Sequence, residues 1–354
     1  MRAKLEDVCV RGSSSLKQSD VIDKTGEYPI YGAAGYIGNV DFYHQDQPYI
    51  AVVKDGAGIG RTSLYPAKSS VIGTMQYLLP KENVLPEYLC YVVKYMHLEK
   101  YFTGATIPHI YFKDYKKEEF NLDILDRQKE IVNILGRIEC VISSRQQELQ
   151  KLDELIKARF VEMFGDPYVN PLKWKKLKIK DAVTIEPQNG LYKPQSDYVT
   201  DGTGIPILRI DGFYDGMVTD FASLKRLKCS ETERQRYLLL EDDIVINRVN
   251  SIEYLGKCAH IKELLEDTVY ESNMMRMHFD PEYYNPVYIC KLLCSQFIYD
   301  QIVNHAKKSV NQASINQKDV LDFNIYQPPL DLQNEFADFV HQVNKSKVVV
   351  SNIS

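Results

Sequence analysis

The clearest pattern in the chain is a long stretch of helical periodicity near its middle. Between positions 126 and 164 there is no proline and one glycine, and apolar residues recur at steps of three, four and, once, seven. This spacing places them on one face of a helix, with charged residues on the other faces. The apolar positions are Ile131, Leu135, Ile138, Ile142, Leu149, Leu152, Ile156, Phe160 and Met163. The pattern predicts one helix of roughly 55 Å, close to a heptad seam, that needs a partner helix.

The end of this helix and its partner can also be predicted. Gly165 and Pro167 end the helix, because glycine adopts the C-terminal turn and proline cannot continue it. The partner is a shorter apolar stripe between positions 334 and 350, which begins at Phe336 and continues through Val340 and Val343. We expect the two helices to pair antiparallel. Because the second is shorter, part of the first should face another protein.

The rest of the chain is built twice. Segments 110–130 and 315–335 share Ile, Lys, Asp, Leu, Asp, Gln and Glu at a constant offset of 205 residues. The starts of the two copies, Leu5 to Cys9 and Ile179 to Val183, match at an offset of 174, so the second copy carries 31 additional residues. A period this long indicates duplication of a whole domain and not an array of short repeats.

Each copy has the order strand, turn, strand, strand, helix. The expected strands and helices are 49–53, 61–65, 75–79 and 86–95 in the first copy, and 243–247, 256–261, 274–279 and 286–294 in the second. This order predicts an α+β fold with a curved, mostly antiparallel sheet in each domain. The predicted parts are a first domain (1–124), the long helix (125–164), a linker (165–172), a second domain (173–329) and a short C-terminal helix (330–354).

Composition narrows the class of protein only slightly. The 43 basic and 48 acidic residues give a net charge of −5, which excludes a uniformly basic protein. No apolar stretch approaches the ~20 residues of a membrane span, and we expect no signal peptide, because the first residues lack an apolar h-region. The seven cysteines include no C-x-x-C pair, so we expect reduced thiols, no metal site and a cytoplasmic protein. Basic residues nevertheless gather locally, as at Lys113, Lys116 and Lys117, with tyrosines between them.

Two motifs suggest catalysis but have simpler interpretations. Gly56, Gly58 and Gly60 follow a predicted strand as in a nucleotide-binding loop, but the next residues favour a strand, and a phosphate site needs a helix there. The segment Asn285–Tyr288 is similar to the Asn-Pro-Pro-Tyr motif of adenine methyltransferases. Its third residue departs from that motif, and Pro286 is typical of a helix start. We therefore expect no catalytic site in this chain.

The junction after the long helix carries the most specific resemblance. It reads Met163-Phe-Gly-Asp-Pro167, then Asn170-Pro171 and Trp174. Each copy also closes on a related pattern, Thr103–Thr106 before Ile110 and Ser309–Gln312 before Ile315, followed by Leu-Asp-x-Gln. With these motifs the whole chain resembles the specificity (S) subunit of type I restriction–modification systems. The family commonly ends in a second helix as long as the first, which this sequence lacks.

The resemblance implies two tandem target recognition domains separated by an antiparallel coiled-coil helix pair, each reading one half of a bipartite double-stranded DNA target. A helix of ~55 Å corresponds to about 15 base pairs at 3.4 Å each. Two modification subunits would dock on the coil and carry S-adenosylmethionine, and a restriction subunit would bring ATP and Mg²⁺. The chain itself would hold no cofactor and would not be an enzyme. The coil positions are Ile131, Leu135, Ile138, Ile142, Leu149, Leu152, Ile156 and Phe160.

Residues that contact DNA can be nominated only by chemistry and position. Arginine and lysine suit guanine, and asparagine and glutamine suit adenine. On turns and loops these types are Lys54, Arg61, His109, Lys113, Arg209, Arg248, Asn250, Asn311, Gln312 and Lys318. Two alternatives stay open: a self-contained adenine-N6 DNA methyltransferase that uses Asn285–Tyr288, and a coiled-coil scaffold that does not touch DNA.

Overall fold

The computed structural model describes all residues except 22, 105–106, 215, 219, 311 and 353–354. The chain divides into unit 1 (residues 1–144) and unit 2 (residues 145–354), and the helix α4 (Leu125–Phe164) runs from the first into the second. The other helices are α1 (Leu5–Val8), α2 (Pro86–Tyr95), α3 (Phe112–Tyr115), α5 (Glu231–Tyr237), α6 (Pro286–Leu293), α7 (Gln296–His305), α8 (Gln317–Leu321) and α9 (Leu330–Asn352). No described helix is both long enough and apolar enough to cross a bilayer.

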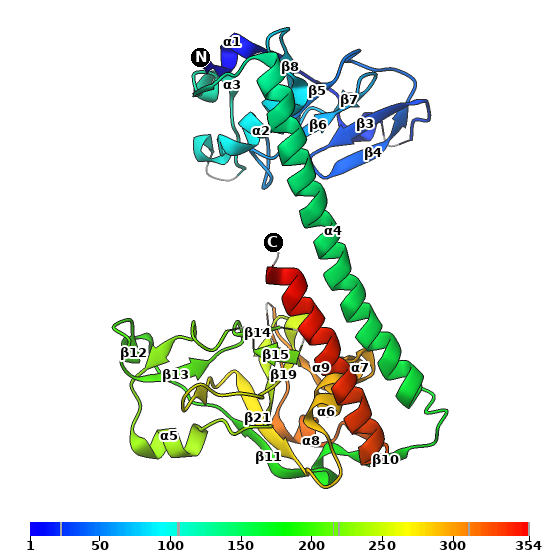
Figure 1. The fold of residues 1–354 in the computed structure, drawn as a ribbon, viewed down its shortest axis with the longest axis vertical. Helices are drawn as coiled ribbons and strands as arrows, with labels where there is room; N and C mark the ends of the chain where they lie inside the picture. Colours follow the sequence, from blue (N-terminus) through cyan, green and yellow to red (C-terminus); the bar gives the residue numbers. More distant parts are fainter. Residues whose placement is uncertain (22, 105–106, 215, 219, 311, 353–354) are drawn as a thin grey trace. The chain divides into compact units, whose positions relative to one another are not determined.

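Unit 1 is built around one antiparallel sheet in the order β2-β8-β5-β6, beside a second sheet in the order β4-β3-β7 (Figure 1). Its strands are β1 (Arg2–Lys4), β2 (Cys9–Ser13), β3 (Tyr28–Gly32), β4 (Gly35–Val40), β5 (Tyr49–Val53), β6 (Thr62–Tyr65), β7 (Ser70–Val71), β8 (Met75–Pro80) and β9 (Glu119–Asn121). All five residues of β5 are buried, as its continuous apolar sequence predicts for a central strand covered on both faces.

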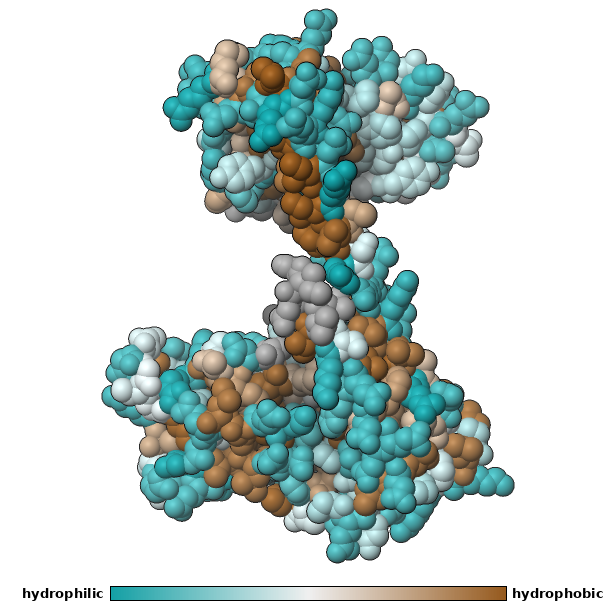
Figure 2. All heavy atoms as spheres, viewed as in Figure 1, coloured by the Kyte–Doolittle hydropathy of each residue, from teal (hydrophilic) through white to brown (hydrophobic). Residues whose placement is uncertain are grey.

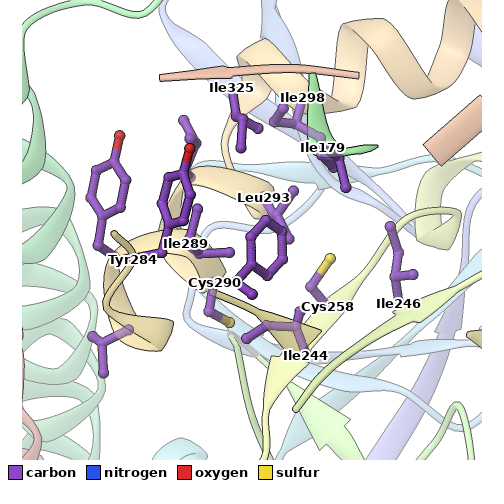
Figure 3. Close-up of a cluster of buried hydrophobic side chains, with 14 of the residues drawn as sticks. Ile179, Ile244, Ile246, Cys258, Tyr284, Ile289, Cys290, Leu293, Ile298 and Ile325 are labelled. Atoms are coloured by element: carbon purple, nitrogen blue, oxygen red, sulfur yellow. The ribbon is translucent and has the colours of Figure 1, made fainter. Parts of the chain in front are cut away.

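Unit 2 repeats this plan with a larger sheet, β11-β21-β17-β19-β15-β14. Its strands are β10 (Lys175–Lys178), β11 (Val183–Asn189), β12 (Tyr198–Val199), β13 (Ile205–Leu208), β14 (Phe213–Tyr214), β15 (Gly216–Val218), β16 (Arg226–Leu227), β17 (Ile244–Asn247), β18 (Val249–Asn250), β19 (Cys258–His260), β20 (Val269–Tyr270), β21 (Met274–Phe279), β22 (Lys307–Lys308), β23 (Ala313–Ser314) and β24 (Asn324–Gln327). Ile244 and Ile246 of β17 meet Ile289 and Leu293 of α6 in the main core (Figure 3).

The duplication extends to the register of the strands. β5 pairs with β8 and β6 as β17 pairs with β21 and β19, so that Val53 lies opposite Met75 and Asn247 opposite Met274. The parallel pairing of β3 with β7 recurs as β13 with β20. The mixed α and β fold and the two related domains expected from the sequence are therefore confirmed.

A buried glutamine fixes the start of α4 on unit 1. Gln128 has no exposed surface, and its side-chain oxygen accepts from the backbone N–H of Leu85 at 2.8 Å. Its amide nitrogen donates to the carbonyl oxygens of Asn83 at 3.0 Å and Asp123 at 2.8 Å. One side chain thus satisfies three backbone groups, which ties α4 to the segment that begins α2.

The equivalent glutamine does the same for α9. The side-chain oxygen of Gln333 accepts from Asn285 N at 2.9 Å, and its amide donates to Tyr283 O at 2.9 Å and Pro328 O at 2.8 Å. Gln333 is also fully buried. The repeated Leu-Asp-x-Gln motif therefore has a structural cause, because this glutamine completes the backbone hydrogen bonding where each helix leaves its domain.

The expected antiparallel helix pair is formed by α9 and the C-terminal part of α4 (Figure 1). Arg159 forms an ion pair with Glu335 at 2.9 Å, and Asp153 pairs with Lys347, so positions fall along α4 as they rise along α9. The ring of Phe160 lies between two aromatic rings. Its centroid is 5.5 Å from that of Phe336 of α9 and 5.6 Å from that of Tyr288 of α6, on which it stacks. α9 has 23 residues against 40 in α4, which confirms that the second helix is short.

We expect Gln333→Leu to lower the free energy of unfolding by about 1–3 kcal/mol, because it leaves three backbone groups without their partner, one of them in a buried hydrogen bond and two in partly buried ones. Urea unfolding followed by fluorescence of Trp174, the single tryptophan, measures this in unit 2. The matched control is Gln342→Leu on the exposed face of α9, which should change stability by no more than about 0.5 kcal/mol. Equal unfolding curves for the two variants would contradict the role of Gln333.

Candidate nucleic-acid interface

Directly after its central strand, each unit forms the same small set of backbone hydrogen bonds between distant segments. Several of the nominated residues lie in these segments. In unit 1 the backbone N–H of Lys54 donates to Thr74 O at 2.9 Å, and its carbonyl accepts from Ile110 N at 2.9 Å. Next to it, His109 pairs as a β-bridge with both Asp55 and Thr103. We call residues 54–55, 103 and 109–110 the junction sheet of unit 1.

The junction sheet of unit 2 comprises residues 248–250, 307–308 and 313–315. The N–H of Arg248 donates to Asn273 O at 2.8 Å, and its carbonyl accepts from Ile315 N at 3.0 Å. β18, β23 and β22 form its three strands. Arg248 therefore occupies the position of Lys54, and the structure brings it close to Asn250 on β18, which pairs with Ala313.

Charged groups orient the side chains of the first junction sheet. The carboxylate of Asp55 lies 2.7 Å from Nδ1 of His109 and 3.7 Å from Nζ of Lys54. His109 in turn stacks on Tyr111, with ring centroids 6.4 Å apart. The ion pairs hold these side chains in place, and their partial exposure leaves them available to a ligand. Asp55 was not predicted from the sequence.

Two nominated lysines follow the junction sheets at equivalent positions. Lys113 lies on α3 and Lys318 on α8, and both are exposed. The ammonium of Lys113 lies 5.4 Å from the ring centroid of Tyr111. Each lysine comes three residues after the isoleucine that bonds to the junction sheet, so the fold places a cation at the same point of each unit.

The remaining nominated loop residues are less uniform. Arg61 lies across the glycine turn from Lys54, and its Nε donates to Gly58 O at 3.4 Å. The turn leads into β6, which confirms the strand predicted after Gly60. Gln312 is exposed at the β22–β23 hairpin. The side chain of Asn250 accepts from the next backbone N–H at 2.8 Å, and Asn311 lies outside the described residues.

Arg209 is not part of a junction sheet. It follows β13, and its Nη1 lies 3.8 Å from Oε1 of Glu271, which follows β20. Sequence reasoning missed Glu271. The shared Pro-Ile at positions 29–30 and 206–207 would have aligned β3 with β13, but only the parallel pairing of these strands with β7 and β20 identifies the partner position.

The methyltransferase-like segment is structural. Asn285 caps α6 by accepting from Val287 N at 2.9 Å, and Pro286 occupies the first turn. Tyr288 is buried, and its hydroxyl donates to Tyr326 O at 3.2 Å, so its ring has no open face for an extruded base. Within the described residues, no group of three or more His, Cys, Asp or Glu side chains could hold a metal ion.

The apolar stripe of α4 falls into three parts. At its start, Ile131 packs on the core of unit 1. At its end, Leu152, Ile156 and Phe160 join the core of unit 2. Between these parts the stripe is only partly covered. Leu135 and Leu149 are half-buried, whereas Ile138 and Ile142, together with the neighbouring Ile134 and Val141, are 45–54% exposed. Figure 2 shows this band of apolar surface along α4 in unit 1.

The two units both match one protein family. The sequence pattern of the type I restriction modification DNA specificity domain covers residues 1–154 and 171–349. The chain belongs to this family. The resemblance noted at the helix junction is thereby confirmed, and the two copies are two such specificity domains.

Relatives and solved structures of the family agree with this assignment. The specificity subunit of the EcoKI restriction enzyme of Escherichia coli is 26% identical over 276 residues, which are 71% of this chain and 58% of that protein. A putative MjaX specificity subunit of Methanocaldococcus jannaschii is 29% identical over 170 residues, or 47% of this chain and 38% of that protein. The chain thus spans only about half the length of these relatives. The S subunit of M. genitalium shares the fold, with a TM-score of 0.61 at 13% identity over 99% of this chain and 91% of that one.

The covered and exposed parts of the α4 stripe can be distinguished by replacing one side chain in each part with alanine. We expect Phe160→Ala to destabilise the isolated chain by about 3–5 kcal/mol, because it empties space between α4, α6 and α9. Ile138→Ala should change stability by no more than about 0.5 kcal/mol, because that side chain is largely exposed. Urea unfolding followed by circular dichroism compares them. A comparable loss in both variants would show that the middle of α4 is covered within the chain.

Proposed function

We propose that this chain is the DNA sequence-specificity subunit of a type I restriction–modification complex and reads a bipartite target, one half-site per unit. The observation that carries this proposal is the family match over both units. The structure adds support, because the same junction sheet recurs in each unit with different side chains on it. Two copies of one scaffold with different surfaces suit the reading of two different half-sites.

The chemistry of the junction sheets supports DNA as the ligand. Unit 1 presents Lys54, His109 and Lys113 there, and unit 2 presents Arg248 and Lys318 with the exposed pair Lys307 and Lys308. Cations on adjoining segments suit phosphate contacts, which position a protein on the duplex. The arginine, together with Asn250, Asn311 and Gln312, supplies the groups that read guanine and adenine edges.

The exposed part of α4 offers a surface to protein partners, and the family resemblance implies which partners these are. A soluble protein rarely leaves an apolar band of this kind open, and such surfaces usually mark protein contacts. We infer that two modification subunits bind here and carry S-adenosylmethionine, and that a restriction subunit adds ATP and Mg²⁺. In this proposal the chain holds no cofactor and performs no catalysis itself. A scaffold that never touches DNA is the remaining alternative, and it leaves the paired cationic sites without a purpose.

The direct test is methylome sequencing of cells that express the chain with its modification subunits. We expect one methylated motif made of two half-sites separated by a fixed number of unspecified base pairs. Lys113→Glu and Lys318→Glu should each reduce methylation across all sites, because they place a negative charge near phosphate. Cells with the modification subunits alone are the control and should lack the motif. A methylated motif in those cells, or full methylation by both variants, would contradict the proposal.

The length of α4 predicts the spacer between the half-sites. Inserting four helix-forming residues after Gln146 lengthens the helix by about 6 Å, close to two base pairs. We expect the methylated motif to keep both half-sites and to gain about two base pairs in the spacer. Replacing Gln146 and Gln147 by alanine changes no length and serves as the control. An unchanged spacer in the insertion variant would show that the helix does not set the spacing.

A further inference from the structure

The two units differ in chemistry where β3 and β13 end. In unit 1 the residue after Tyr31 is Gly32, and the N–H of Ile72 donates to Tyr31 O at 3.0 Å. A Cβ added to Gly32 would lie 2.9 Å from Cδ1 of Ile37 and 3.2 Å from Cδ1 of Ile72. The first unit therefore closes this point with apolar contacts and leaves no room for a polar side chain.

In unit 2 the same backbone arrangement carries charged side chains where unit 1 has apolar contacts. The N–H of Glu271 donates to Leu208 O at 2.9 Å, which is the equivalent of the bond from Ile72. The residue after Leu208 is Arg209. An arginine and a glutamate thus replace a glycine and an isoleucine, at the carboxyl ends of two parallel strands where their side chains meet.

The pair is close but incompletely bonded. Nη1 of Arg209 and Oε1 of Glu271 are 3.8 Å apart, which is too long for a hydrogen bond. Nε of Arg209 and Oε2 of Glu271 are shielded and have no hydrogen-bond partner among the described residues. Burial raises the pKa of the Glu271 carboxyl, and the guanidinium opposes this shift. Leaving such atoms unpaired costs free energy, and the contact between the two side chains leaves part of their hydrogen-bonding capacity unused.

The surroundings orient the pair toward a ligand. The guanidinium of Arg209 lies 5.7 Å from the ring centroid of Tyr198 and donates to its hydroxyl at 3.4 Å. The side chains of Arg209 and Glu271 remain 25% and 16% exposed. Arg248 of the junction sheet donates from Nη1 to Ser272 O at 3.2 Å, directly after Glu271. The segment 271–273 therefore connects this pair to the candidate DNA surface.

We propose that Arg209 and Glu271 together read one G·C base pair in the half-site of unit 2. Arg209 would donate to O6 and N7 of guanine, and Glu271 would accept from N4 of cytosine, which lies beside O6 in the same pair. Features common to both units, such as Lys113 and Lys318, position the duplex, and features that differ distinguish the sequences. This inference rests on the proposed function and assigns its base specificity.

The test is the methylated motif of complexes that carry Arg209→Gln or Glu271→Gln. Wild type should require G·C at one position of one half-site. Each variant should lower discrimination there by about tenfold to a hundredfold, because glutamine at position 209 can bond adenine in place of guanine, and glutamine at position 271 can donate to O4 of thymine in place of accepting from cytosine. The other half-site and the spacer should stay unchanged. Arg226→Gln is the matched control, since Arg226 forms an ion pair with Glu266 in the same unit but away from segment 271–273.

The outcomes separate this inference from the proposed function. A bipartite wild-type motif that both variants leave unaltered overturns the reading pair while the specificity function stands. If Arg209→Gln abolishes methylation everywhere by unfolding the chain, the nearly isosteric Glu271→Gln decides: relaxation of the one position supports the pair, and an unaltered motif overturns it. A wild-type complex without any bipartite motif refutes the proposed function itself.

Discussion

A helix of forty residues carries a longer apolar face than either adjoining domain can cover, and this constraint shapes the molecule. Unit 1 buries the start of the α4 stripe at Ile131, and unit 2 buries its end at Ile156 and Phe160. α9 adds an antiparallel partner over the last turns only. The middle of the stripe stays exposed, as Ile138 and Ile142 show with 48% and 45% of their surface accessible. A surface of this kind is stable in water only at modest size, so the same geometry that joins two domains also creates a surface suited to a partner.

The duplication separates two demands that a DNA-reading protein must meet. The backbone around each junction sheet is repeated bond for bond, including the bonds of Ile110 and Ile315 to the central strand and the buried glutamines at the helix starts. The repeated scaffold places two exposed lysines, Lys113 and Lys318, at equivalent points. The side chains at the ends of β3 and β13 are not repeated, and there an apolar contact has become an ion pair. The two units thus keep the same backbone geometry here while a few of their side chains differ.

The sequence predicts the elements whose residues alone determine them. Strand 49–53 is a continuous apolar run and strand 274–279 nearly so, Pro86 and Pro286 begin helices, and α4 follows its periodicity; all were found within one or two residues. Two-residue strands such as β7, β20 and β22 were not predicted, because they exist only through pairing with distant segments. The same holds for the site. Lys54 and His109 could be nominated from their chemistry, but Asp55 and Glu271 could not, since a carboxylate in an acidic chain carries no signal until its partner is known.

The net charge of −5 illustrates why global averages conceal local function. On α4 the acidic residues are largely balanced within the helix, as in the pairs Arg127–Glu130, Arg145–Glu148 and Arg159–Glu162. Lys113 and Lys318, by contrast, have no ion pair among the described residues. An unpaired lysine contributes its full charge to the local potential, whereas the two charges of an ion pair largely cancel, and salt screens both beyond about one Debye length. Both junction sheets therefore carry local cations even though the chain as a whole is acidic, which is the charge distribution that the proposed DNA contact requires.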